Sequence, residues 1–239
     1  FYGTYGAFTG SRMFWDASKS ALRSGRDGDG TYWSDANIGS YSFATGYNSK
    51  ASGNHSNSIG PWTTASGEAS VALGDALTSG GNTSVAIGSF SSASGDYTLA
   101  AGRWVTAGPI ANTMAIGKGV DDSNRMTNNT ADSLGIGFNS TVPTFFVGPA
   151  SGIGTYGKVG VGTTTPAYAL DVNGTVAATS AIFVANGHIN FGANLGDTGY
   201  GIRDNAGTLE YKNDLGAWAS FAPGGGDYVS TSGDTVSGG

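Results

Sequence analysis

Apolar, small and polar positions follow a seven-residue grid between residues 39 and 102. Glycine opens each heptad, Ser or Thr mostly stands three residues later, and a small residue stands five residues later. A heptad is too short for a helix, and its i, i+2 alternation predicts a short strand. A strict short period of this kind predicts a solenoid. The grid glycines are Gly39, Gly46, Gly53, Gly60, Gly67, Gly74, Gly81, Gly88, Gly95 and Gly102.

The residues four and six positions after glycine alternate between successive heptads, so the true 14-residue repeat is a double heptad. One heptad carries aliphatic pairs such as Val71 and Leu73, and the next carries polar pairs such as Thr64 and Ser66. We therefore predict coils with two short strands and two turns. Glycine at each turn permits a positive φ, so we expect a β-branched residue at Gly74 to be strained.

The small column occurs in both heptads, so we expect it to point inward between two closely spaced sheets. The aliphatic residues then point outward and stack into a stripe along the solenoid. Because a large apolar patch rarely faces water, the stripe predicts a closed homo-oligomer in which copies meet at an axis. The stripe consists of Ile59, Val71, Leu73, Val85, Ile87 and Leu99.

The segments SVALGDA (70–76) and SVAIGSFSSASGDYTLAAG (84–102) resemble the YadA-like head repeats of trimeric autotransporter adhesins. The resemblance covers residues 36–117. It implies a left-handed parallel β-roll with three chains around one axis, and therefore a homotrimer displayed outside the cell.

The remaining residues lack this grid and divide the chain into further expected parts. We expect an aromatic cap over 1–35, a loop insertion with a terminal roll strand over 118–142, a β-rich fibre module over 143–222 and a Gly/Ser-rich linker over 223–239. The module contains a two-strand segment with a Thr-Thr-Pro turn (158–176) and a β-meander (199–221). Both resemble segments of phage tail fibres and bacterial surface proteins. The predicted fold class is all-β, a β-roll followed by small β-meander or β-prism-like fibre modules.

Composition excludes several kinds of site. The 239 residues include no cysteine, which rules out disulfides and thiolate chemistry. The net charge of −6 argues against nucleic-acid binding. No apolar run approaches the roughly 18 residues of a membrane span.

Catalytic and metal motifs are weak in this chain, and we expect no enzyme and no cofactor. The two histidines, His55 and His188, lack the partners of a catalytic triad. The GIGTYG segment (152–157) matches a dinucleotide motif, but strand-like residues follow it where a helix is required. Asp27-Gly-Asp-Gly resembles the start of a calcium loop, but Ile38 occupies the twelfth position. We interpret it and Asp121-Asp122 as solvated turns, with Ca²⁺ binding as the alternative.

A column two residues after each glycine contains several aromatic residues. These rings either pack between chains or form an exposed row that contacts a glycan or a host surface. The sequence thus predicts a non-enzymatic surface fibre or adhesin. The alternatives are a phage tail fibre or spike segment and a purely structural filament subunit. The candidate binding residues are Tyr41, Trp62, Phe90, Tyr97 and Trp104.

Overall fold

The computed structural model describes residues 9–177, 188–191, 200–206, 208–212 and 217–221. Contacts divide the chain into two units, residues 1–176 and 177–239, which we describe separately. Strands form almost all regular structure of the described residues, with one 3-10 turn at Asp35–Asn37. The predicted all-β class is confirmed. Nothing in the described ranges forms a helix long and apolar enough to cross a membrane.

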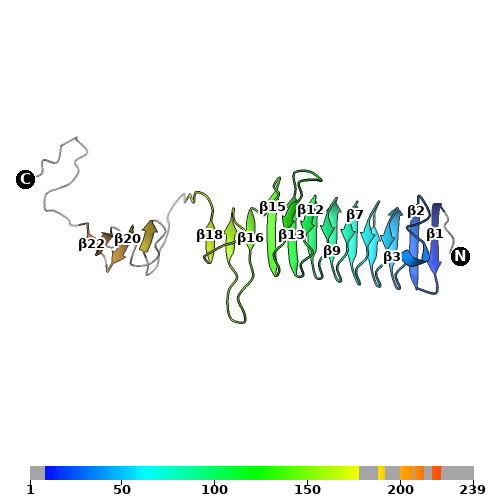
Figure 1. Cartoon of the computed structure of the whole chain (residues 1–239), viewed down its shortest axis with the longest axis horizontal. Helices are drawn as coiled ribbons and strands as arrows, with labels where there is room; N and C mark the ends of the chain where they lie inside the picture. Colours follow the sequence, from blue (N-terminus) through cyan, green and yellow to red (C-terminus); the bar gives the residue numbers. More distant parts are fainter. Residues whose placement is uncertain (1–8, 178–187, 192–199, 207, 213–216, 222–239) are drawn as a thin grey trace, which may run out of the picture. The chain divides into compact units, whose positions relative to one another are not determined.

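A sheet of 12 strands runs the length of the first unit, and we call it the long sheet (Figure 1). Strands β2 to β15 pair in parallel, each with the strand of the next coil. The register advances by one double heptad per coil through the repeat, so that Val71 lies beside Val85, and Val85 lies beside Leu99. The strands, in spatial order, are β1 (Gly10–Asp16), β2 (Ala21–Asp27), β3 (Phe43–Tyr47), β5 (Asn57–Ile59), β7 (Val71–Asp75), β9 (Val85–Ser89), β11 (Leu99–Arg103), β13 (Thr113–Lys118), β15 (Ser133–Phe138), β16 (Phe145–Val147), β17 (Val159–Val161) and β18 (Leu170–Val172).

A second, short sheet is made by the alternate heptads. Its six parallel strands each follow a strand of the long sheet in the chain. Each coil therefore contributes one strand to each sheet, as the double heptad predicts. The strands are β4 (Lys50–Ala51), β6 (Thr64–Ala65), β8 (Thr78–Ser79), β10 (Ser92–Ala93), β12 (Val105–Ala107) and β14 (Met126–Asn128).

The interior between the two sheets is narrow and is built from small side chains. The small column points inward as predicted, and its alanines are fully buried: Ala44, Ala51, Ala65, Ala72, Ala86, Ala93 and Ala100. The Ser/Thr column also points inward, and most of its hydroxyls donate to the carbonyl of the glycine three residues earlier. Ser70 Oγ lies 2.8 Å from the Gly67 oxygen, and Ser84 Oγ lies 2.6 Å from the Gly81 oxygen. These bonds satisfy polar groups that would otherwise be costly to bury.

Turn geometry differs from the expectation at half of the grid glycines. Positive φ occurs at Gly46, Gly60, Gly74, Gly88 and Gly102. The expectation is wrong at Gly39, Gly53, Gly67, Gly81 and Gly95, which have no positive φ. The left-handed conformation belongs instead to the residues two positions after each glycine, such as Trp62 (φ 49°) and Thr83 (φ 53°).

Close stacking of the coils explains why glycine is nevertheless needed at every grid position. A Cβ on Gly67 would overlap the carbonyl oxygen of Gly81 and lie 2.9 Å from the Asn82 nitrogen. A Cβ on Gly74 would overlap the carbonyl oxygen of Gly88. Glycine is therefore needed in both heptads because neighbouring backbones are in contact there. Only one of the two heptads also has a positive φ at its glycine.

The region 118–132 is more than the polar loop that the sequence predicts. It contains β14, which pairs in parallel with β12 and places Met126 beside Val105. Both side chains are fully buried. An apolar residue at an inward position is enough to extend the short sheet by one strand, although its neighbours in sequence are polar.

The N-terminal segment forms the first strands of the long sheet. β1 and β2 are an antiparallel hairpin, and β2 continues in parallel into β3. Trp33 is buried and donates from Nε1 to the Ser49 oxygen at 2.9 Å. Arg23 is also buried and donates to the carbonyls of Ser42 and Ala51. Burial lowers the Arg23 pKa to about 10, and the negative charge of Asp16 opposes part of this shift by raising the pKa. The expected cap role of 1–35 remains a prediction, and Phe8 lies outside the described residues.

The strands after the roll continue the long sheet, and the first unit ends at residue 176, within the expected fibre module. β16 pairs antiparallel with β15 and with β17. The predicted strand pair around the Thr-Thr-Pro segment is present as β17 and β18, and the two strands are parallel. Residues 162–169 connect them, because two parallel strands cannot be joined by a tight turn.

The second unit contains the predicted β-meander. Its antiparallel strands are β19 (His188–Phe191), β20 (Tyr200–Asn205), β21 (Thr208–Lys212) and β22 (Ala219–Ser220). Residues 213–216 of the expected meander and the expected linker at 223–239 lie outside the described residues.

Candidate attachment surface

The turns of the roll form two separate ladders, one on each edge of the sandwich. On one edge the His55 nitrogen donates to the Ser40 oxygen (2.8 Å). On the other edge the Trp62 nitrogen donates to the Tyr47 oxygen (2.8 Å). Each ladder has one such hydrogen bond per double heptad, because every strand of the long sheet begins at one edge of the roll and ends at the other.

The candidate aromatic column is therefore two rows. Tyr41 and Tyr97 lie on one edge, whereas Trp62, Phe90 and Trp104 lie on the other. The interpretation of these residues as a single rim is wrong, because successive heptads alternate between edges. Only the double heptad returns the chain to the same edge.

The first edge, which we call the acidic edge, consists of the turns after Gly39, Gly53, Gly67, Gly81 and Gly95 and continues to Asp132. Asp96 Oδ1 accepts from the Asn82 nitrogen at 2.8 Å, and Asn112 Nδ2 donates to Asp132 Oδ1 at 2.9 Å. Tyr41 and His55 stack with ring centroids 5.1 Å apart. The carboxylates of Asp96 and Asp132 on this edge thus accept hydrogen bonds from residues of neighbouring coils. Its charged and aromatic residues are Tyr41, His55, Glu68, Asp96, Tyr97 and Asp132.

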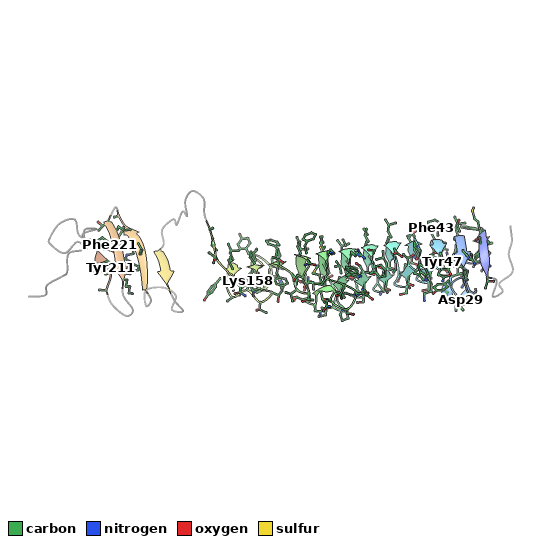
Figure 2. All side chains as sticks on the ribbon, turned by 90° about the horizontal axis from the view of Figure 1, so that it is seen from above. Asp29, Phe43, Tyr47, Lys158, Tyr211 and Phe221 are labelled. Atoms are coloured by element: carbon green, nitrogen blue, oxygen red, sulfur yellow. The ribbon has the colours of Figure 1, made fainter. Side chains whose placement is uncertain are left out.

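The second edge, which we call the cationic edge, consists of the turns after Gly25, Gly46, Gly60, Gly74, Gly88, Gly102, Gly117 and Gly137. The Arg103 guanidinium lies 3.8 Å from the centroid of the Trp104 ring, and Lys118 Nζ lies 5.9 Å from it. Tyr47 and Trp62 meet edge to face with centroids 5.0 Å apart. Figure 2 labels Tyr47 near the N-terminal end of this row. The charged and aromatic residues of the edge are Arg26, Tyr47, Trp62, Asp75, Phe90, Arg103, Trp104, Lys118 and Phe138.

Three of the five candidate aromatics are exposed in the single chain: Tyr41 (65%), Trp62 (54%) and Tyr97 (62%). Phe90 and Trp104 are half-buried. All five have a left-handed backbone with φ between 49° and 57°, and so do Ala69 and Thr83 at equivalent positions. This conformation belongs to the coil and fixes the direction in which each ring leaves the edge.

The predicted apolar stripe lies on the outer face of the long sheet. Leu73 (43%) and Ile87 (41%) are exposed, and Ile59, Val71, Val85 and Leu99 are half-buried. Figure 2 shows side chains standing out along this sheet, with Phe43 labelled toward its N-terminal end.

The outer stripe also extends beyond the residues that sequence reasoning identified. Met114 lies beside Leu99, and Ile116 lies beside Ala101. Leu134 and Ile136 follow on β15 in the same register. The signal is present in the sequence, but the next coils, from Gly102 to Gly117 and from Gly117 to Gly137, are longer than a double heptad and break the period.

The carboxylates of the first acidic turn, Asp27 and Asp29, accept hydrogen bonds within that turn. The Asp27 carboxylate is buried and accepts from the Gly30 nitrogen (2.7 Å) and the Trp33 nitrogen (2.9 Å). Asp29 accepts from the Thr31 hydroxyl and nitrogen, which lowers the Asp29 pKa. Within the part of the chain that the structure describes, no three His, Cys, Asp or Glu side chains are grouped to hold a metal ion.

The second carboxylate pair, Asp121 and Asp122, is also bound by groups of its own loop. Asp121 accepts from the Asn124 side chain and backbone and from the Ser123 nitrogen, and the Asn124 bonds lower its pKa most. Asp122 forms an ion pair with Arg125. Both carboxylates therefore stabilise the loop after β13.

The other candidate motifs are the GIGTYG segment and the two histidines. Residues 152–156 are exposed, and the segment leads into β17, a strand and not a helix, as expected. His55 stacks on Tyr41 at the acidic edge, and the side chain of His188 lies outside the described residues.

Comparison with protein families matches the repeat and not the rest of the chain. Residues 38–56, 58–76 and 79–103 match the family model of the YadA head domain repeat. Comparison with the curated proteins finds no match. The matched residues coincide with the coils that contain β3 to β11. Residues 38–103 are therefore YadA head domain repeats, as their sequence resemblance predicted.

Proposed function

We propose that this chain is part of a homotrimeric fibre that is displayed outside a cell and attaches to another surface without catalysing a reaction. The family matched by residues 38–103 is a structural adhesin family and not an enzyme family. The proposal extends this family role to the chain.

The observation that carries the trimer is the outer face of the long sheet. Aliphatic side chains lie in register on five successive strands, from Ile59 on β5 through Leu73, Ile87 and their neighbours to Ile116 on β13. A continuous apolar face of this length is rarely left in water. Three copies around one axis would bury it against itself.

Attachment would use the edges of the roll. Three exposed rings, Tyr41, Trp62 and Tyr97, stand on rigid turns, and Tyr and Trp suit contacts that are apolar on one side and polar on the other. Threefold symmetry would present every row three times. Weak contacts would then add by avidity, by a factor of roughly 10² or more.

The assembly is tested by light scattering of the 239-residue chain. We expect three times the 23.9 kDa of one chain. Val85→Asp should yield monomers, because carboxylates converging in a dry axis cost several kcal/mol each. A stable, folded wild-type monomer would overturn the trimer and the fibre.

Attachment is tested with beads that carry the chain, passed over immobilised cells under flow. Wild-type beads should be retained, and beads coated to the same density with an unrelated protein should be washed off. An intact trimer whose beads do not adhere to any cell type would overturn attachment and leave a purely structural filament.

A further inference from the structure

The two edges of the roll differ in charge. The acidic edge carries Glu68, Asp96 and Asp132, and Lys19 at its N-terminal end is paired with Asp35. The register positions of the cationic edge carry Arg26, Arg103, Lys118 and the carboxylate of Asp75. The end turns of this edge also contain the carboxylates of Asp27, Asp29, Asp121 and Asp122. Arg103 and Lys118 on neighbouring strands make a cationic strip beside most of the aromatic rings.

Within the described residues, the cations of this strip are in no ion pair. The ion pairs among the described residues are Lys19–Asp35, Arg125–Asp122 and Arg203–Glu210. Arg26, Arg103 and Lys118 are in none of them. The nearby Asp27 and Asp121 carboxylates accept hydrogen bonds within their own turns.

Rings and cations are combined most closely at the C-terminal part of the strip. Arg103 and Lys118 are register partners on neighbouring strands, about 4.8 Å apart along the roll. Both lie over the Trp104 ring, and Phe90 lies beside it with a centroid distance of 6.4 Å. The Trp62 ring is three coils away in the same row. The strip is therefore linear and parallel to the roll axis.

We propose that the cationic edge binds a linear anionic polysaccharide laid along the roll, with sugar rings on Trp62, Phe90 and Trp104 and carboxylate or sulfate groups paired with Arg103 and Lys118. This assignment rests on the proposed attachment function and names its ligand class. Half-exposed aromatic rings on rigid turns offer flat apolar surfaces for sugar faces, and the guanidinium and ammonium groups donate charge-assisted hydrogen bonds to the anions.

The spacing of the cations favours a polysaccharide over a nucleic acid. Arg26 and Lys118 are six coil spacings apart, about 29 Å, with only Arg103 between them as a further cation. Duplex DNA carries one charge per roughly 1.7 Å, so most of its phosphates would have no partner, and Asp75 would repel those at the middle of the strip. A polysaccharide with one anion on every second sugar has a much lower charge density and uncharged rings between its anions.

The test is calorimetric titration of the full 239-residue chain with four polymers. The probes are κ-carrageenan (one sulfate per disaccharide), hyaluronate (one carboxylate per disaccharide), dextran (neutral) and single-stranded oligothymidylate (a phosphate polymer). We expect κ-carrageenan, hyaluronate or both to bind, dextran not to bind, and added NaCl to weaken binding. Binding of only one of the two would identify sulfate or carboxylate as the recognised anion.

Variants locate the site on the strip. Arg103→Gln with Lys118→Gln should weaken binding by about tenfold or more, because two charge-assisted contacts are lost. Trp104→Asn should weaken it similarly, and asparagine keeps the left-handed turn, as Asn48 and Asn112 do at equivalent positions. The matched control is His55→Asn on the acidic edge, where His55 has the same left-handed backbone (φ 58°). This variant also replaces a ring by asparagine, and it should change affinity by less than about twofold, since no proposed contact is removed.

Several results would overturn the assignment. These are absence of binding by both anionic polysaccharides, equal loss in His55→Asn and Trp104→Asn, or oligothymidylate binding as tightly as the polysaccharides. Light scattering provides a further check, because dissociation of the trimer by the Arg103/Lys118 double variant would place this edge between copies. A trimer that still adheres to cells but binds no anionic polysaccharide would refute the ligand class while leaving the attachment function standing.

Discussion

The glycine column of the roll should be intolerant of a single methyl group, and Gly74→Ala tests this. Gly74 has φ +142°, a region that side chains rarely occupy, and strain there costs about 1–3 kcal/mol. Its new Cβ would also overlap the Gly88 oxygen and lie 2.9 Å from the Gly88 carbonyl carbon and 3.1 Å from its nitrogen. The two coils must then separate, which weakens ladder hydrogen bonds worth about 0.5–1.5 kcal/mol each.

Together these effects predict a loss of about 3–5 kcal/mol in the free energy of unfolding. For a unit of this size, that corresponds to a fall in Tm of roughly 6–20 °C. The assay is thermal unfolding followed by far-UV circular dichroism at one fixed chain concentration, because Tm of an oligomer depends on concentration.

Two further variants separate the causes. Gly67→Ala has no positive φ to strain but has the same overlap, here with the Gly81 oxygen, so it should be destabilised by overlap alone. Gly80→Ala is the matched control, because its Cβ would meet only Ser66 Oγ at 3.8 Å and Ser94 Cα at 3.9 Å. Its Tm should change by no more than about 2 °C. If Gly74→Ala and Gly67→Ala have the same Tm as the control, a Cβ at these positions does not force the coils apart, and the steric argument is wrong.

Other variants test the interior and the second unit. Ser84→Ala should lower the free energy of unfolding by about 1–2 kcal/mol, because the buried Gly81 carbonyl loses its hydroxyl donor and the buried Ser79 hydroxyl loses its Ser84 partner; thermal unfolding measures this. Met126→Ala should cost about 2–5 kcal/mol by leaving a cavity under the short sheet, and a surface-like effect below about 0.5 kcal/mol would contradict the burial of β14. Hydrogen bonding from Arg203 lowers the Glu210 pKa, so this contact stabilises the meander above the usual carboxyl pKa and is lost as pH falls through the lowered value. NMR titration of the Glu210 carboxyl should show its pKa rising in Arg203→Gln, and an unchanged pKa would refute the contact.

The sequence alone determined the coil. The double-heptad period, the inward Ala column and the outward stripe through Val71 and Val85 all follow from neighbours within a few residues, where alternation sets the direction of each side chain. The resemblance of 70–76 and 84–102 to known head repeats added the family, and the family match confirmed it.

Tertiary structure decided which residues meet across coils. Trp62 and Trp104 share an edge with each other and not with Tyr97, because only every second turn returns to one side. Arg103 meets Lys118 on the next coil, although that coil departs from the double-heptad spacing and so hides their relation in the sequence. Met126 belongs to a strand of the short sheet although its neighbours in sequence are polar, because it points inward beside Val105 of the neighbouring coil. Local periodicity cannot predict these pairings, since they depend on the number of residues in each coil before the backbone returns to the same position.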